Sequence, residues 1–84
     1  METEIERKYY SNGQLMYERP FLNGKYHGIL KGWRDNGNIE YIYPHVNDES
    51  QGICQDWNYG GTRDRVIQYK NDIQHGIKIV FKYE

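Results

Sequence analysis

Histidine and cysteine are the side chains of this sequence with the widest chemical reach, because they bind metals and act as bases or nucleophiles. His27 and His75 lie 48 residues apart. If every 24 residues form one hairpin, their rings stand four strands apart, roughly 19 Å, whereas metal ligands lie about 2 Å from the ion. His45 and Cys54 can approach across one hairpin, but two ligands without a third make a poor metal site. These residues predict a structural or exposed role, with metal binding as the alternative.

Motifs for catalysis are not found in the sequence: there is no nucleophile elbow, no catalytic carboxylate pair and no glycine-rich phosphate loop. We therefore expect no enzymatic activity, no metal and no cofactor. Glu2, Glu4 and Glu6 alternate along the first segment. They predict a charged sheet edge that blocks unwanted strand pairing, with a negatively charged docking strip as the alternative.

Composition favours one all-β domain over residues 1–84. Alanine is missing and leucine is rare, whereas isoleucine, tyrosine and tryptophan, the strand-favouring types, are well represented. The net charge of −1 and a pI near 6.3 lack the basic balance that marks a nucleic-acid partner.

The cellular compartment is predicted from the first residues of the sequence and from its single cysteine. Residues 1–4 are acidic and no apolar run reaches the length of a membrane span, so we expect no signal peptide and no membrane partner. Cys54 is alone and is compatible with a reducing compartment. A cytoplasmic protein is expected.

A period of 24 residues runs through the chain without insertion. One column holds isoleucine in every copy, a second holds an aromatic residue four positions later, and two more hold glycine. The regularity predicts repeats at 5–28, 29–52 and 53–76 and a closing strand at 77–83. The columns are Ile5, Ile29, Ile53 and Ile77; Tyr9, Trp33, Trp57 and Phe81; Gly13, Gly37 and Gly61; and Gly28, Gly52 and Gly76.

Two turn signals occur in each period. The dipeptides at 12–13, 36–37 and 60–61 favour tight primed hairpin turns with positive φ. Longer loops closed by glycine are expected at 23–28, 47–52 and 71–76. The segments between turns suit strands rather than helices. The expected fold is a single-layer, twisted antiparallel meander of about seven strands, near 3–10, 15–22, 28–34, 39–46, 52–58, 63–70 and 76–83.

Alternation within the strands predicts which side chains share a face. Ile29 and Trp33 point one way while Leu30 points the other. Pro20 and Pro44 share a column inside predicted strands, where a missing N–H breaks the ladder, so we expect a bulge or bend there.

Residues 10–15 and 21–28 resemble the MORN-repeat variant of bacterial toxin–antitoxin and immunity-type proteins. The later copies carry the pattern at 35–39 and 51–52, and at 59–62, 71–72 and 75–76. The resemblance implies an elongated, twisted sheet of hairpins and a role in protein–protein contact, often neutralising a toxin or enzyme. The third copy departs from the pattern at Arg63 and Arg65, where the earlier copies have apolar or tyrosine residues.

Exposed apolar surface is expected, because a single-layer sheet has no second layer to cover both faces. The aromatic column is open to two readings, structural stacking within the sheet and a binding face. In the last strand the alternate apolar residues predict an open edge that pairs with a target or with a second copy. The candidate protein-binding residues are Tyr9, Tyr17, Trp33, Tyr41, Trp57, Arg63, Arg65, Tyr69, Ile77, Ile79 and Phe81.

Together these patterns predict a protein-binding repeat module. The first hypothesis is an intracellular inhibitor or antitoxin/immunity-type protein that masks a toxin or defence enzyme, with a phage or mobile element as a candidate source. The alternatives are a structural oligomerisation or membrane-surface scaffold module, and a nucleic-acid or DNA-mimic role. The expected partner is a protein target, with a homodimer through the C-terminal strand as a second hypothesis.

Overall fold

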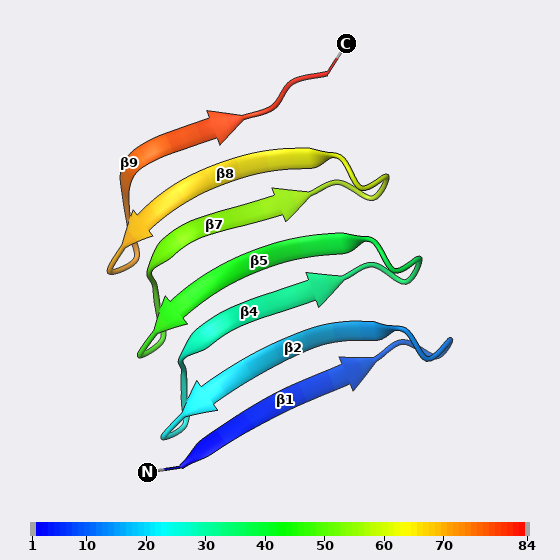
Figure 1. The fold of residues 1–84 in the computed structure, drawn as a ribbon, viewed down its shortest axis with the longest axis vertical. Helices are drawn as coiled ribbons and strands as arrows, with labels where there is room; N and C mark the ends of the chain where they lie inside the picture. Colours follow the sequence, from blue (N-terminus) through cyan, green and yellow to red (C-terminus); the bar gives the residue numbers. More distant parts are fainter. Residues whose placement is uncertain (1, 84) are drawn as a thin grey trace.

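In the computed structural model each long strand pairs with the long strands next to it in the sequence. The structure describes residues 2–83 and has no helix in that range. The predicted all-β, single-layer antiparallel meander is confirmed (Figure 1). The sheet measures 49 × 38 × 9 Å. Met1 and Glu84, the ends of the predicted domain, lie outside the described residues. The sheet order is β1 (Thr3–Tyr9), β2 (Leu15–Leu22), β4 (Gly28–Trp33), β5 (Ile39–Val46), β7 (Gly52–Trp57), β8 (Arg63–Lys70) and β9 (Ile73–Val80), and the short strands β3 (Lys25–Tyr26) and β6 (Glu49–Ser50) pair with β2 and β5.

The loops that follow β1, β4 and β7 are wider than predicted. In the first, the N–H of Gly13 donates to the carbonyl of Tyr10 at 3.0 Å, and only the glycine of the Asn12–Gly13 pair has a positive φ, of 89°. This is the pattern of a type I turn followed by a left-handed glycine. The prediction of primed turns here is wrong. The Asn12 side chain accepts the N–H of Gln14 at 2.9 Å, but the third copy makes the same turn with Gly60 in place of the asparagine, so that bond is not the common cause.

The primed turns lie at the other end of each hairpin. Asn47 and Asp48 have φ values of 48° and 70°, and Val46 pairs directly with Glu49. Two successive left-handed residues between paired strands form a type I′ turn. The long loops predicted here are therefore two-residue turns. For the same reason β9 begins at residue 73 rather than 76. Its end also differs from the prediction and lies at residue 80 rather than 83.

The predicted irregularity at Pro20 is present on one side of β2 only. Pro20 pairs in regular register with Ile5 of β1, while on the other side the ladder stops at Glu18 and resumes at Phe21. The third copy has Gln68 in the proline column and still shifts register there. Proline is therefore not the common cause. All three copies share a left-handed glycine opposite this point, at 28, 52 and 76, with φ between 80° and 120°.

One face of the sheet is covered more closely by its own side chains than the other. Among the described residues the buried apolar side chains are Leu30 and Cys54, at 7% and 6% exposure. Next to Leu30, the ring of Tyr41 lies over Gly32, where any Cβ would overlap it. Tyr41 also stacks on Tyr43, with ring centroids 4.7 Å apart. Aromatic rings lying across neighbouring strands thus stand in for a second layer on this face.

Candidate protein-binding surfaces

Strand register assigns each candidate side chain to one of two faces, because directly opposite residues of an antiparallel pair share a face. We call them the isoleucine–tryptophan face and the tyrosine face. The predicted binding residues are thereby separated into two groups. On the isoleucine–tryptophan face lie Tyr9, Trp33, Trp57, Arg63, Ile77, Ile79 and Phe81, and on the tyrosine face lie Tyr17, Tyr41, Arg65 and Tyr69.

A row of isoleucines crosses the whole isoleucine–tryptophan face, one in each copy. Their exposed fractions are 53%, 47%, 40% and 57% for Ile5, Ile29, Ile53 and Ile77. Like residues two strands apart stand roughly 10 Å from each other. Pro20 and Pro44 lie directly opposite the first two isoleucines and fill the intervening strands.

The isoleucine column is evident in the sequence, but the predicted binding residues do not include Ile5, Ile29 or Ile53. The column, taken together with the single layer of the sheet, is the signal that points to them. A column that is apolar in every copy must either be covered or remain exposed. In a sheet whose close side-chain packing lies on the other face, it remains exposed.

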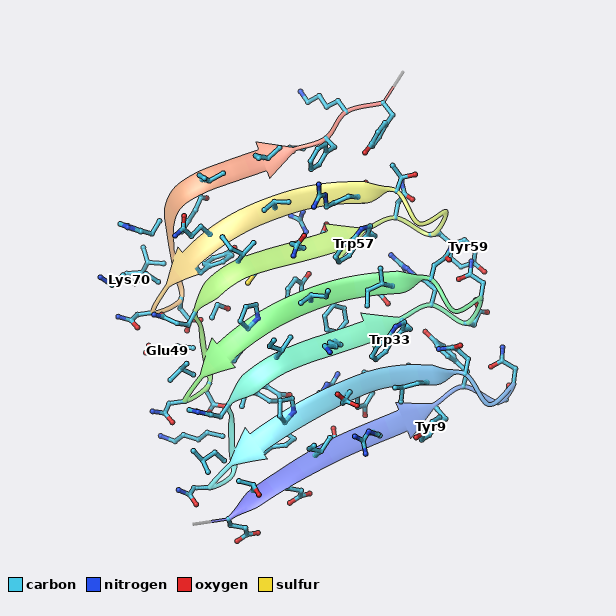
Figure 2. The ribbon with its side chains drawn as sticks, viewed as in Figure 1. Tyr9, Trp33, Glu49, Trp57, Tyr59 and Lys70 are labelled. Carbon is cyan, nitrogen blue, oxygen red and sulfur yellow. The ribbon has the colours of Figure 1, made fainter. Side chains whose placement is uncertain are left out.

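The aromatic column runs beside the isoleucines on the same face. Tyr9, Trp33 and Trp57 occupy corresponding points on successive copies (Figure 2). The aromatic ring pairs of residues 2–83 join other side chains, all on the tyrosine face. Ring-to-ring stacking within this column therefore finds no support among these contacts, but Trp33, Trp57 and Phe81 are half-buried and only Tyr9, at 56%, is exposed. Both readings of the column stay open.

Arg63 and Arg65 lie on opposite faces although they are two residues apart. Arg63 donates to Gln55 at 3.1 Å and its guanidinium lies 5.0 Å from the Phe81 ring centroid, on the isoleucine–tryptophan face. Arg65 forms a two-pronged pair with Asp56, with Nη2 to Oδ2 at 2.8 Å and Nε to Oδ1 at 3.3 Å. The two arginines by which the third copy departs from the repeat pattern therefore belong to different faces of the sheet.

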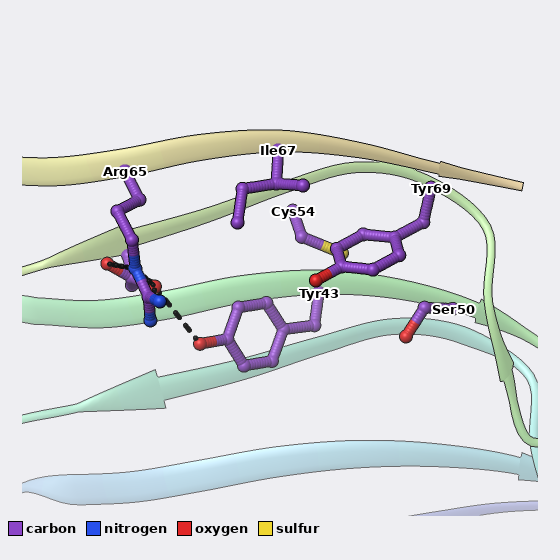
Figure 3. A pocket seen from close by; sticks show the side chains of 7 residues that line it. Tyr43, Ser50, Cys54, Arg65, Ile67 and Tyr69 are labelled. Carbon is purple, nitrogen blue, oxygen red and sulfur yellow. Dashed lines mark hydrogen bonds and ion pairs between the residues drawn. The ribbon is translucent and has the colours of Figure 1, made fainter. Parts of the chain in front are cut away.

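A hollow of about 190 Å³ opens on the tyrosine face (Figure 3). Asp56 is already neutralised by Arg65, and the Tyr43 hydroxyl lies 3.4 Å from Asp56. Burial and the neighbouring Asp56 charge raise the pKa of Tyr43 to about 12, so it stays neutral near pH 7. Burial also raises the pKa of the Cys54 thiol, which disfavours the nucleophilic thiolate. The side chains are Tyr43, Ser50, Cys54, Asp56, Arg65, Ile67 and Tyr69.

Histidine and cysteine do not converge on a ligand site in the described structure. His45 Nδ1 lies 3.0 Å from the carbonyl of Tyr43, whereas Cys54 lies directly opposite Ile67 on the next strand. In residues 2–83 no group of three His, Cys, Asp or Glu side chains is placed to hold a metal ion. The same residues contain no helix long and apolar enough to cross a membrane.

Comparisons with known proteins do not add to this description: no protein-family model, curated protein or solved structure matches the chain. The candidate surfaces are therefore defined by geometry and exposure alone.

Proposed function

We propose that this protein binds another protein through its isoleucine–tryptophan face. The observation that carries the proposal is the row of isoleucines left 40–57% exposed across all four copies of the column. Moving such a side chain from full exposure to full burial is worth about 1.5–3 kcal/mol, so a partner that covers these half-exposed isoleucines gains about half of that at each position. Beside the row lie two tryptophans, a type enriched among interface hot spots, and Phe81, a type enriched at interfaces.

The shape of the sheet supports the same proposal. Its long dimensions of 49 and 38 Å enclose more area than the roughly 800 Å² that each partner buries in a standard interface. The face is built on hydrogen-bonded strands, so no segment has to fold when a partner binds, which limits the entropy lost. A broad, thin sheet with an apolar face suits covering a partner's surface.

The proposed role is that of an inhibitor or antitoxin/immunity-type protein that masks a toxin or defence enzyme in the cytoplasm. The resemblance of residues 10–15 and 21–28 to MORN-variant repeats supports this role. A large protein-binding face can block an active site by steric cover, without any chemistry of its own.

Affinity capture with three forms of the full chain tests the binding face. We expect the wild type to retain one protein, Ile29→Lys/Ile53→Lys to lose it, and the tyrosine-face control Tyr17→Ser/Tyr69→Ser to keep it. Ile29→Thr/Ile53→Thr keeps the β-branched shape and replaces the lysine variant if that one does not fold. Retention by the lysine variant at the wild-type level, or loss only in the tyrosine-face control, would contradict the proposed face.

Expression of the retained protein tests the inhibitory role separately. Alone it should slow growth or show an enzymatic activity, and co-expression with this chain should reverse the effect. If its activity is the same with and without the chain, the inhibitor role is wrong while the binding face stands.

A further inference from the structure

The two open edges of the sheet differ in charge. Four of the seven residues of β1 are charged, namely Glu4, Glu6, Arg7 and Lys8, and such charges hinder the addition of another strand. The other edge is β9, and its pairing with β8 continues to Phe81. The part of this edge that follows the left-handed Gly76, residues 77–81, carries one charge within five residues. The segment 77–81 is thus the edge that remains open to strand addition.

Backbone groups on this segment are directed to the open side. The N–H of Phe81 donates to the carbonyl of Asp64 on β8, at 2.8 Å. Alternate residues of an antiparallel strand turn both backbone groups to the same neighbour. The odd-numbered residues of 77–81 therefore bond to β8, and Lys78 and Val80 turn their N–H and C=O groups away from it. An incoming strand can bond to both.

We propose that two copies of this chain pair antiparallel along residues 77–81, with the two-fold axis at Ile79, so that their sheets join into one. The charges select this register. A pairing centred on Lys78 places Lys78 opposite Lys78 of the second copy, and a pairing centred on Val80 places Lys78 opposite Lys82. When the pairing is centred on Ile79, Lys78 lies opposite Val80 of the second copy and all five residues of the segment are paired.

Side chains agree with the same register. On the isoleucine–tryptophan face, Ile79 meets Ile79 of the second copy and Ile77 meets Phe81, and Ile77 and Ile79 are 57% and 44% exposed in the single chain. The apolar face then continues from one copy into the next. The pairing uses the edge rather than the face, so it stands whether or not the proposed target-binding function is correct.

Cysteine cross-linking tests the register. Residues 79 of the two copies would form a non-hydrogen-bonded pair with Cα atoms about 4.5 Å apart, which is within the disulfide range. Residues 77 of the two copies would lie four positions apart, roughly 14 Å, which is too far. On mild oxidation we expect a linked dimer from Ile79→Cys and none from Ile77→Cys. Cys54 is buried and common to both variants. Equal cross-linking of both variants, or no dimer from Ile79→Cys, overturns the proposed register.

Sedimentation equilibrium tests the backbone pairing. Val80→Pro removes an N–H that bonds to no strand in the single chain, so the fold should survive at this edge. Two intermolecular hydrogen bonds are lost by symmetry, and we expect dimerisation to weaken about tenfold or more. Val80→Thr keeps the N–H and the β-branched shape and should dimerise as the wild type does. A wild type that stays monomeric, forms species larger than a dimer, or is unaffected by the proline overturns the proposal. Ile29→Lys/Ile53→Lys should still dimerise, which separates this result from failure of the binding face.

Discussion

Gly32 and Tyr41 show how a single-layer sheet covers itself at the level of one residue pair. The two residues lie directly opposite on β4 and β5, and the tyrosine ring occupies the space above the glycine. The glycine costs the strand conformational entropy, but it lets a large ring lie flat on the backbone. The resulting contact extends to Tyr43 through the stacked rings.

Gly32→Ala should destabilise the protein by about 1–3 kcal/mol, because the added Cβ overlaps the Tyr41 ring and forces it aside. Gly60→Ala is the matched control, since the nearest atom to its Cβ is Oδ1 of Asn58 at 3.6 Å, and we expect a change within about 0.5 kcal/mol. Urea unfolding followed by far-UV circular dichroism measures both. Equal effects of the two variants would mean that the ring contact contributes nothing.

Tyr43 couples stability to alkaline pH. Burial and the Asp56 charge raise its pKa to about 12, from an ordinary value of 10. Below pH 10 the hydroxyl is protonated in both the folded and unfolded chains, so its contribution is fully present. Between pH 10 and 12 the unfolded chain releases the proton first, and stability falls.

Tyr43→Phe cannot lose a proton, so its free energy of unfolding should fall less steeply than that of the wild type between pH 10 and 12. At neutral pH the variant should be slightly less stable, because the hydroxyl contact to Asp56 is lost. Urea titrations at several pH values compare the two proteins. Parallel losses across the alkaline range would show that Tyr43 is not the group responsible.

At the scale of the structural elements, the type I′ turns reverse the chain and also form hydrogen bonds to the neighbouring hairpin. The carboxylate of Asp48 accepts the N–H of Tyr26 at 2.7 Å, and the N–H of Asp48 donates back to the Tyr26 carbonyl at 2.9 Å. Asp72 makes the same pair of bonds to Ser50. One side chain thus sets both a left-handed turn and the contact between successive copies.

Two substitutions of Asp48 separate these roles. Asp48→Gly loses the carboxylate but accepts the φ of 70°, and should cost about 1–2 kcal/mol. Asp48→Ala also places an ordinary residue in the left-handed region and should cost about 1 kcal/mol more. Glu49→Ala, next in the chain, is the control and should change little. Thermal unfolding ranks the three variants. A glycine variant as unstable as the alanine variant would refute the backbone part of this account.

At the scale of the whole molecule, one face of the layer is closely covered and the other is open. The buried apolar side chains of residues 2–83 belong to the tyrosine face, while the isoleucine row stays exposed on the other. Stability must come mainly from strand ladders and ring contacts. The apolar area left over is then available for a partner.

A hydrophobic dye such as anilinonaphthalene sulfonate should therefore bind the native protein, a property more usual of partly folded states. Ile29→Glu/Ile53→Glu should lower the bound-dye fluorescence severalfold without changing the circular dichroism, because it places carboxylates, which repel the dye's sulfonate, within the exposed row. Tyr17→Ser/Tyr69→Ser should lower it much less. Equal losses from the two faces would contradict the asymmetry of the sheet.

The amino-acid sequence by itself determines the period, the strands and the side chains that share a face within one strand. These features are local: side-chain direction alternates every residue, and turn residues recur at fixed spacing. The isoleucine column could be read as a continuous row for the same reason. The turn types could not, because the backbone of each loop depends on the register of the strands that it joins.

Tertiary structure alone decides how the two faces differ. Strict alternation places Arg63 and Arg65 on one face, but β7 and β8 shift register beside Trp57, where Arg63 pairs with Trp57 and Arg65 with Asp56. The extra residue between the arginines turns Arg63 to the opposite face. Which face is covered likewise depends on rings that lean across neighbouring strands, as Tyr41 does over Gly32. Such contacts join residues distant in the chain, and no local pattern encodes them.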